Sequence, residues 1–307
     1  MKIFAATDHS ERFIDAIVRA NGIEVTRGKA KIQRFSNGEM HINVPDNVAG
    51  EICVVVGSIA PPDEQLLATL MLVDVLVRDG AEHVYVYMPY LAYGRQDKLS
   101  PGEGGGIALM GALLKAVGAA QVITYDVHSD DDIDILGIPL SSLSPASLFA
   151  EAIAKLGWED MTIVAPDEGA VGRSTEVSLA LGTHTPVAYC INERVGGAPR
   201  LQLIGDVGKR VVIVDDVLDT GRTLLSVCAL LQNKGVRDIA VAVTHGLFRG
   251  DGWKELFAHG VRIIFVTDSC PDALHVSHED IHVLELGNEA KKVLSIVEEK
   301  EYRDDFE

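Results

Sequence analysis

Positive charge is scarce in this sequence of 307 residues. Lys and Arg number 27 against 45 Asp and Glu, which gives a formal net charge of -18. Proteins that bind nucleic acid need basic residues gathered on one surface, and the sequence has no such cluster. The charge balance therefore argues against a nucleic-acid partner. An anionic substrate would need a few local basic side chains together with a divalent cation.

Long apolar runs and paired cysteines are also missing. No stretch approaches the roughly 20 apolar residues of a membrane-spanning helix, and the N-terminal residues lack the apolar core of a secretory signal. The four cysteines, Cys53, Cys190, Cys228 and Cys270, lie far apart, and none forms a Cys-x-x-Cys pair. Isolated cysteines of this kind are usually buried free thiols, and they fit a reducing compartment. We therefore expect a cytoplasmic protein with no membrane partner.

The sequence does have the composition and periodicity of an α/β protein. Apolar residues make up 47% and charged residues 23% of a chain long enough for two globular domains. Short β-branched runs alternate with segments of helical spacing, as in parallel sheets covered by helices on both faces. A Pro- and Ser-containing stretch at 139–145 separates two halves of this kind. We expect two doubly wound parallel-sheet domains, residues 1–143 and 144–307.

One segment in the second half combines the features of a ligand site. The uninterrupted apolar run Val211–Val214 predicts a buried strand, and two acids, Asp215 and Asp216, come directly after it. A polar turn then leads into an apolar helix that begins at Leu224. The turn consists of Asp219, Thr220, Gly221, Arg222 and Thr223.

This segment has the chemistry to bind a ribose phosphate. Backbone N–H groups at a helix N-terminus lack intrahelical acceptors and attract an anion. The hydroxyl groups of Thr220 and Thr223 add donors, and Gly221 lets a ligand approach the backbone closely. The paired carboxylates can accept hydrogen bonds from sugar hydroxyls. An ordinary strand–helix connection with a capping Asp or Thr is the alternative interpretation.

Other polar groups follow predicted strands, and the pattern alone leaves their roles open. The stretch 33–44 predicts a hairpin around Ser-Asn-Gly. The loop 89–98 is either solvated or part of a ligand site at a strand end. His128 is either a metal ligand or a polar cap, and the acidic run at 130–134 is either a solvated loop or a site. The glycine-rich stretch 100–106 lacks the Gly-Lys-Ser/Thr ending of a Walker loop.

The segment 211–224 resembles the ribose-phosphate-binding motif of the type I phosphoribosyltransferase fold. The whole chain is similar to one branch of that fold, the ribose-phosphate pyrophosphokinases or PRPP synthetases. Plain phosphoribosyltransferases lack the N-terminal domain that carries three of the five shared motifs. In family order, these motifs are Phe35-Ser-Asn-Gly-Glu39, Tyr93-Gly-Arg-Gln-Asp97, Asp126-Val-His128, Pro166-Asp167-Glu-Gly169 and Thr244-His-Gly-Leu-Phe248.

The resemblance implies a reaction, a cofactor and an assembly. The reaction is transfer of the β,γ-diphosphoryl group of ATP to the anomeric hydroxyl of ribose 5-phosphate, which gives PRPP and AMP, with Mg²⁺ as the cofactor. The family completes its ATP site across a subunit interface, so a homo-oligomer is implied. The ATP-binding residues implied in this way are Phe35, Asn37, Glu39, Arg95, Gln96 and Asp97.

The resemblance also implies a catalytic set and an acceptor site. His128 and Asp167 would hold Mg²⁺ and its diphosphate, and Arg194 would supply positive charge to the transition state. Asp215 and Asp216 would face the ribose hydroxyls. The turn at 219–223 would hold the 5-phosphate.

Several positions depart from the family pattern. The family's catalytic loop begins with a Lys that is followed two residues later by an Arg. Arg194 fits the second place, whereas Asn192 occupies the first, and residues 157–208 contain no Lys. Arg222 stands where synthetases usually have Gly, and Asn37 replaces an Asp. The acidic run replaces a Gln-rich run that in the family serves subunit contacts and an allosteric phosphate site.

These departures keep three alternatives open. One is a diverged diphosphokinase for a larger ribose-5-phosphoryl acceptor such as ADP-ribose. Another is a catalytically impaired regulatory homologue that binds synthetase subunits. The last is a phosphoribosyltransferase or nucleic-acid-binding regulator, which the acidic charge and the N-terminal motifs disfavour.

Overall fold

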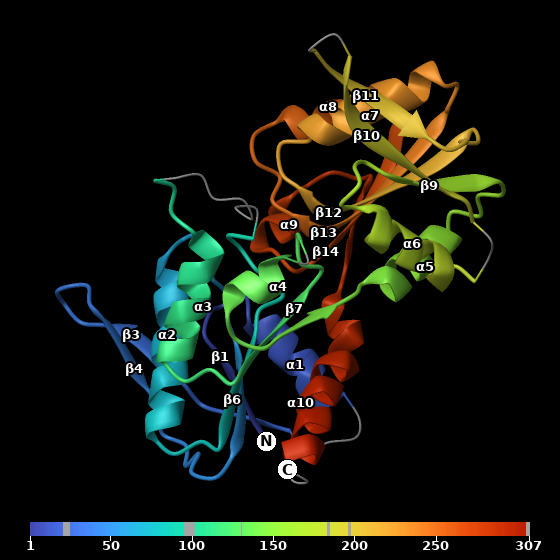
Figure 1. The fold of residues 1–307 in the computed structure, drawn as a ribbon. Helices are drawn as coiled ribbons and strands as arrows, with labels where there is room; N and C mark the ends of the chain where they lie inside the picture. Colours follow the sequence, from blue (N-terminus) through green and yellow to red (C-terminus); the bar gives the residue numbers. More distant parts are fainter. Residues whose placement is uncertain (21–24, 95–101, 130, 183–184, 196–197, 305–307) are drawn as a thin grey trace. The chain divides into compact units, whose positions relative to one another are not determined.

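The chain divides into two compact units. The computed structural model describes residues 1–20, 25–94, 102–129, 131–182, 185–195 and 198–304 (Figure 1). Unit 1 consists of Met1–Leu143 and Leu286–Glu307, and unit 2 consists of Ser144–Glu285. The expected range of 144–307 for the second domain is therefore wrong at its C-terminal end, because the last segment of the chain packs with unit 1.

Unit 1 is built on a six-stranded sheet in which every neighbouring pair is parallel. The strand order is β2-β1-β5-β6-β7-β8. Near-continuous apolar sequence explains the burial of the central strands, which are covered on both faces. The strands are β1 (Lys2–Ala5), β2 (Thr26–Arg27), β5 (Ile52–Val56), β6 (His83–Tyr87), β7 (Gln121–Tyr125) and β8 (Leu140–Leu143).

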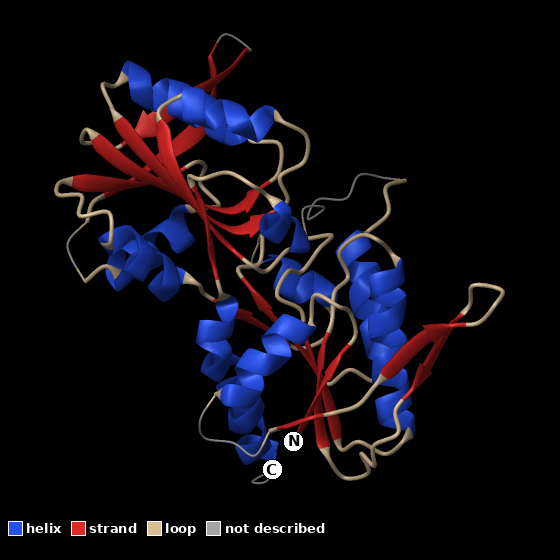
Figure 2. Cartoon of the chain, turned by 180° about the vertical axis from the view of Figure 1, so that it is seen from behind, coloured by secondary structure: helices blue, strands red, loops and turns tan. Residues whose placement is uncertain are grey.

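Helices cover both faces of this sheet (Figures 1 and 2). The helices α2 (Glu64–Arg78) and α3 (Gly106–Ala116) lie on one face, and α4 (Asp131–Leu136) packs against α3. On the other face lie α1 (Glu11–Arg19) and α10 (Ala290–Asp304), which contact each other. A one-turn 3-10 helix, η2 at Leu286–Glu289, joins α10 to the rest of the chain. Helix α10 buries Val293, Leu294 and Val297 in unit 1.

The predicted hairpin forms a separate two-stranded sheet of unit 1. Strands β3 (Lys31–Arg34) and β4 (Met40–Asn43) pair antiparallel. The Ser-Asn-Gly turn is closed by Gly38, whose φ of 90° suits glycine. Figure 2 shows the hairpin projecting from the body of the unit.

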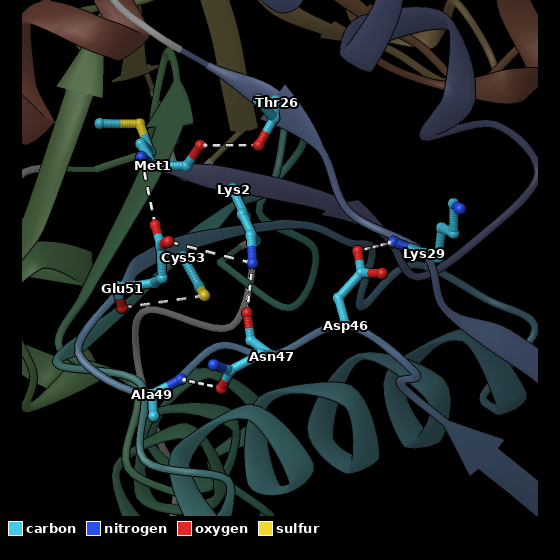
Figure 3. A network of polar contacts seen from close by, with 9 residues as sticks. All are labelled: Met1, Lys2, Thr26, Lys29, Asp46, Asn47, Ala49, Glu51 and Cys53. Atoms are coloured by element: carbon cyan, nitrogen blue, oxygen red, sulfur yellow. Dashed lines mark hydrogen bonds and ion pairs between the residues drawn. The ribbon is translucent and has the colours of Figure 1, made fainter.

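A polar network ties the beginning of β1 to β5 (Figure 3). The Lys2 ammonium contacts the carbonyl oxygen of Asn47 and lies 4.0 Å from a carboxylate oxygen of Glu51. The Asp46 carboxylate accepts a hydrogen bond of 2.8 Å from the backbone N–H of Lys29. These contacts fix the segment before β5 against β1 and against the stretch that follows β2.

Unit 2 is built on a seven-stranded sheet that is parallel except at one edge. The order is β11-β10-β9-β12-β13-β14-β15, and only the edge pair β10–β11 is antiparallel. The strands are β9 (Met161–Ala165), β10 (Val187–Val195), β11 (Ala198–Ile204), β12 (Arg210–Leu218), β13 (Asp238–Gly246), β14 (Val261–Thr267) and β15 (Ile281–Leu284).

The two faces of the second sheet carry different helices (Figures 1 and 2). The helices α5 (Ala146–Ala154) and α6 (Val171–Ala180) cover Val212 and Val214 of β12. The helices α7 (Arg222–Asn233) and α8 (Glu255–Ala258) cover Val211 and Ile213 on the opposite face. This alternation along β12 is what a strand buried on both faces requires. A 3-10 turn, η1 at Gly252–Lys254, precedes α8, and α9 spans Pro271–His275.

The structure confirms the α/β class and its two mainly parallel sheets, and it adds elements that the pattern did not predict. The acidic run contributes to a short helix, α4, and β15 forms an additional edge strand. All four cysteines are buried and free, as expected. Within the described residues, no helix combines the length and the apolar character needed to cross a membrane.

Candidate functional site

The two acids of unit 2 lie within strand β12 rather than after it. The strand continues to Leu218 because Asp215 pairs with Val243 and Val217 pairs with His245 of β13. Asp215 is 9% exposed and Asp216 is 4% exposed. Both carboxyl groups are therefore held by a rigid ladder near the carboxyl ends of the central strands, where α/β proteins bind ligands.

The surroundings of the acids favour one negative charge over two. The Asp215 Oδ1 atom accepts a hydrogen bond of 3.0 Å from the backbone N–H of Asp216. Burial raises the pKa of Asp215 well above its usual range, and the Asp216 carboxylate raises it further. Asp167 acts in the same direction, whereas the Arg173 guanidinium lowers this pKa. Arg173 Nη1 lies 3.5 Å from Asp216 Oδ1.

The turn after β12 presents the N-terminus of α7. Gly221 has a φ of 83° and precedes the first helical residue, Arg222. A Cβ atom at Gly221 would lie 2.8 Å from Cα of Trp253, so glycine is required by the space as well as by the backbone. No acidic residue lies in the first turn of α7, where Arg222 and Thr223 are exposed. The positive end of a 12-residue helix is thus open to an anion.

Asp167 lies at the same edge of the sheet, after β9. It is exposed, and its Oδ1 atom accepts a hydrogen bond of 3.0 Å from the backbone N–H of Ala170. This bond shapes the turn into α6. Because β9 is the direct neighbour of β12, the turn brings the Asp167 carboxylate toward the acids of β12, in agreement with its effect on Asp215.

The predicted catalytic loop forms an antiparallel strand pair. Arg194 lies in β10, where its backbone pairs with Pro199 of β11, and Asn192 pairs with Leu201. Asn192 is exposed. The stretch was expected to be a loop. It is an edge hairpin because β10 and β11 pair from Tyr189 to Val195.

Two groups of unit 2 have no role indicated by the sequence pattern, yet they lie among buried polar contacts. Arg173 lies in the first turn of α6. The helical spacing of the residues that follow Asp167 is the signal that could have placed this side chain near the site. His245, in the Thr-His-Gly motif, is buried, and its Nδ1 atom lies 2.8 Å from Oγ of Ser269. Ser269 also donates a hydrogen bond of 3.0 Å to the carbonyl oxygen of Thr244. This contact links the ends of β13 and β14.

The hairpin of unit 1 carries three of the expected ATP-binding residues on its exposed turn. Phe35 is 54% exposed, and its ring centroid lies 5.1 Å from that of His41. Asn37 Oδ1 accepts a hydrogen bond of 3.2 Å from the backbone N–H of Glu39. An ion pair between Arg34 and Glu64 connects the hairpin to α2. The other three expected residues, Arg95, Gln96 and Asp97, lie outside the described residues.

His128 follows β7 on a turn that β8 anchors. The backbone N–H of Asp126, at a φ of 45°, donates a 2.9 Å hydrogen bond to the carbonyl oxygen of Leu143. The backbone N–H of Val127 donates a hydrogen bond of 3.2 Å to Oγ of Ser142. The His128 side chain is exposed. It belongs to unit 1, whereas Asp167 belongs to unit 2.

The donors fit Mg²⁺ that arrives with a nucleotide better than a resident metal. Among the residues that the structure describes, no group of three or more His, Cys, Asp or Glu side chains could hold a metal ion. Mg²⁺ usually keeps several waters and binds through one or two carboxylates plus substrate phosphates. The exposed Asp167 carboxylate fits such an ion, and the imidazole of His128 suits it less well.

Comparison with known proteins gives one consistent family. Residues 1–118 match the N-terminal domain of ribose phosphate pyrophosphokinase, and residues 134–268 match the phosphoribosyl transferase domain. The ribose-phosphate pyrophosphokinase of Granulibacter bethesdensis is 32% identical over 273 residues, which are 88% of this chain and 87% of that protein. The enzyme of the same name from Methanothermobacter thermautotrophicus is 32% identical over 77% of this chain and 83% of its own.

A solved structure supports the same relationship over both units. The crystal structure of phosphoribosylpyrophosphate synthetase from Mycobacterium smegmatis aligns with a TM-score of 0.84 at 28% identity. The alignment covers 97% of this chain and 99% of that one. With its type I phosphoribosyltransferase fold and the buried acid pair of β12, the chain belongs to the ribose-phosphate pyrophosphokinase family.

Proposed function

We propose that the protein transfers the diphosphoryl group of ATP to the anomeric hydroxyl of ribose 5-phosphate, giving PRPP and AMP. The observation that carries this proposal is the buried pair Asp215 and Asp216 directly before the open N-terminus of α7. The carboxyl groups can bind a diol, and the helix N-terminus can bind a phosphate. Both belong to one continuous strand–turn–helix segment. A ribose 5-phosphate presents the same two groups.

The roles of the acceptor site follow from its chemistry. Asp215 and Asp216 bind the ribose hydroxyls and thereby orient the anomeric oxygen. The N–H groups of the 219–223 turn and the hydroxyls of Thr220 and Thr223 hold the 5-phosphate. Burial of the acids in the β12 ladder fixes the sugar without a conformational change, so most of the rate enhancement assigned to this site is positional.

The reaction is an in-line displacement at the β-phosphorus of ATP. The anomeric hydroxyl releases its proton to solvent as its oxygen forms a bond to that phosphorus, the bond from the phosphorus to the oxygen that bridges to the α-phosphate breaks, and AMP leaves with that oxygen. The transition state carries extra negative charge on its phosphoryl oxygens. Arg194 offsets this charge, and Asp167 and His128 would hold the diphosphate together with its Mg²⁺. Mg²⁺ would supply charge neutralisation when it is bound.

The ATP side of the reaction belongs to unit 1 and to an assembly. Phe35 is more than half exposed, so its aromatic ring is accessible for stacking against a ligand. We propose that Phe35, Asn37 and Glu39, with Arg95, Gln96 and Asp97, bind ATP at a homo-oligomer interface in the cytoplasm.

The direct test is a product assay. The protein is incubated with ATP, Mg²⁺ and ribose 5-phosphate, and AMP and PRPP are measured together. Equal amounts of both products at ordinary enzyme rates would support the proposal. AMP without PRPP would mean hydrolysis, and no AMP with any acceptor would favour the regulatory homologue.

Arg222 supports a second candidate, a diphosphokinase for a larger ribose-5-phosphoryl acceptor such as ADP-ribose. Its cation lies at the first position of α7, where the helix dipole is unfavourable to positive charge. Within the described part of the chain, Arg222 forms no ion pair. A second phosphate beyond the 5-phosphate would use this charge. Product formation with ADP-ribose but not with ribose 5-phosphate, and loss of that preference in Arg222→Gly, would establish this candidate over the first.

A further inference from the structure

We propose that Arg173 is a positioning residue for the acceptor site. Its guanidinium holds Asp216 as the ionised acceptor of a ribose hydroxyl, while one proton shared by the acid pair stays on Asp215. The identity of the sugar rests on the proposed function. The placement of the charge is a property of the protein alone, so it can be tested without a substrate.

The geometry places Arg173 beneath the site rather than in contact with solvent. It lies in the first turn of α6, on the face of the sheet where α6 packs against β12. Its Nη1 atom is 3.5 Å from Asp216 Oδ1, and the two side chains are only 13% and 6% exposed. Water and salt screen such a pair far less than an ion pair on the surface.

Arg173 is a cation that acts on both members of the acid pair: it lies 3.5 Å from Asp216 and lowers the pKa of Asp215. Asp215 accepts the backbone N–H of Asp216 and is also bonded by the Asp216 side chain. Burial raises the pKa of Asp215 most, the carboxylates of Asp216 and Asp167 raise it further, and Arg173 lowers it. Two buried carboxylates in contact do not both ionise readily, so the pair carries one proton over a wide pH range. Contact with Arg173 directs the remaining charge to Asp216.

This arrangement matches a sugar diol. Each hydroxyl is both a donor and an acceptor. An ionised carboxylate can only accept hydrogen bonds, whereas a protonated carboxyl group can also donate one. A pair with one proton can therefore engage both hydroxyls. It also places one negative charge fewer beside the phosphate groups that the site must receive.

The first test measures the charge placement without a ligand. Aspartate labelled with ¹³C at the carboxyl carbon is titrated by NMR in the wild-type protein, in Arg173→Gln and in Arg210→Gln, with Asp215→Asn for assignment. Arg210 lies at the opposite end of β12 and donates a hydrogen bond to the carbonyl oxygen of Glu159. Arg210→Gln therefore removes one Arg far from the acid pair and serves as the matched control. The first ionisation of the pair should move up by about one pH unit or more in Arg173→Gln and remain unchanged in Arg210→Gln. An unmoved ionisation in Arg173→Gln would overturn the proposal.

The second test measures binding of ribose 5-phosphate by calorimetry between about pH 5 and pH 8. In Arg173→Gln the weakening of binding at low pH should begin about one unit higher than in the wild-type protein, so the loss of affinity is largest at the acidic end of this range, up to about tenfold, and shrinks as the pH rises. Arg173→Lys should restore most of the affinity. A loss of the same factor at every pH would show a purely structural role and contradict the proposal.

A double variant covers the case in which Arg173→Gln does not fold. Arg173→Gln with Asp216→Asn neutralises both partners and leaves no buried charge unpaired. It should bind ribose 5-phosphate as Asp216→Asn does, because Arg173 acts through Asp216. A further tenfold loss in the double variant would refute that route. Failure of the wild-type protein to bind ribose 5-phosphate would instead refute the proposed function and leave the NMR result standing.

Discussion

A Cβ atom added to Gly221 would lie 2.8 Å from Cα of Trp253. The turn that ends β12 and the 3-10 helix that precedes α8 therefore meet backbone against backbone. This contact fixes where the N-terminus of α7 points, and hence where the 5-phosphate is expected.

Gly221→Ala should destabilise the protein by about 2–5 kcal/mol. A residue with a side chain in left-handed backbone costs about 1–2 kcal/mol, and overpacking costs about 1–3 kcal/mol. Gly235 is the matched control, since it has a φ of 88° and, apart from Gly235 and its two chain neighbours, no described residue has an atom within 4 Å of the place that its Cβ would take. Gly235→Ala should therefore cost only about 1–2 kcal/mol. Urea unfolding at equilibrium measures both, and equal losses in the two variants would show that the Trp253 contact is relaxed.

Asp215→Asn should gain stability relative to the wild-type protein as the pH rises. The pKa of Asp215 is raised in the folded state, so its contribution to stability is present below the unfolded pKa and is lost as the pH rises through the folded pKa. An amide cannot lose that proton. The difference in unfolding free energy between variant and wild type should grow by about 1.4 kcal/mol for each unit of pKa difference. Denaturation near pH 4 and near pH 8 tests this, and a constant difference would contradict a raised pKa.

Arg194→Ala should lower kcat by a factor of about 10²–10³ while KM for ATP changes little, because the missing charge acts in the transition state. Arg200→Ala removes the same charge from the paired strand β11 and serves as the control. Steady-state kinetics with ribose 5-phosphate measures both variants. Unchanged turnover in Arg194→Ala would place the catalytic cation elsewhere.

Asn192→Lys should raise kcat if β10 takes the place of the family's catalytic loop. The added ammonium would stand two residues before Arg194, in the position of the family Lys. A gain of about tenfold or more is expected from one further charge on the phosphoryl oxygens. Asn192 is exposed, so the unfolding free energy should stay within about 0.5 kcal/mol. A fall in kcat would show that this strand has a different role here.

Asp167→Asn should raise the Mg²⁺ concentration for half-maximal activity at least about tenfold, in line with loss of a carboxylate ligand. The amide oxygen can still accept the hydrogen bond from Ala170, so the turn into α6 should persist. Glu168→Gln removes the same charge from the exposed neighbouring residue and should leave the Mg²⁺ dependence unchanged. Chelation should abolish activity, and added Mg²⁺ should restore it. An identical Mg²⁺ response in the two variants would remove Asp167 from the metal site.

The periodicity of the sequence predicted the sheets well, because uninterrupted apolar runs are typical of parallel strands. It ended β12 too early. Asp215 and Asp216 look like loop residues by their polarity, yet the ladder to β13 keeps them in the strand. The hairpin around Gly38 was predicted correctly, since a turn of this kind depends on local residues alone.

Contacts between distant segments account for what the sequence did not predict. Arg173 meets Asp216 only because α6 folds onto the face of the sheet that carries Asp216. Local propensity does not contain that information. The same holds for α10, because the helical pattern of α10 was visible in the sequence, whereas its packing against α1 was not.

The return of α10 to unit 1 makes unit 2 an insertion within unit 1. The chain crosses between the units twice, after Leu143 and after Glu285. During synthesis, unit 2 can complete its fold as soon as residue 285 has left the ribosome. At that moment unit 1 still lacks α10, the helix that packs against α1. The domain that is made first is therefore the one that is completed last.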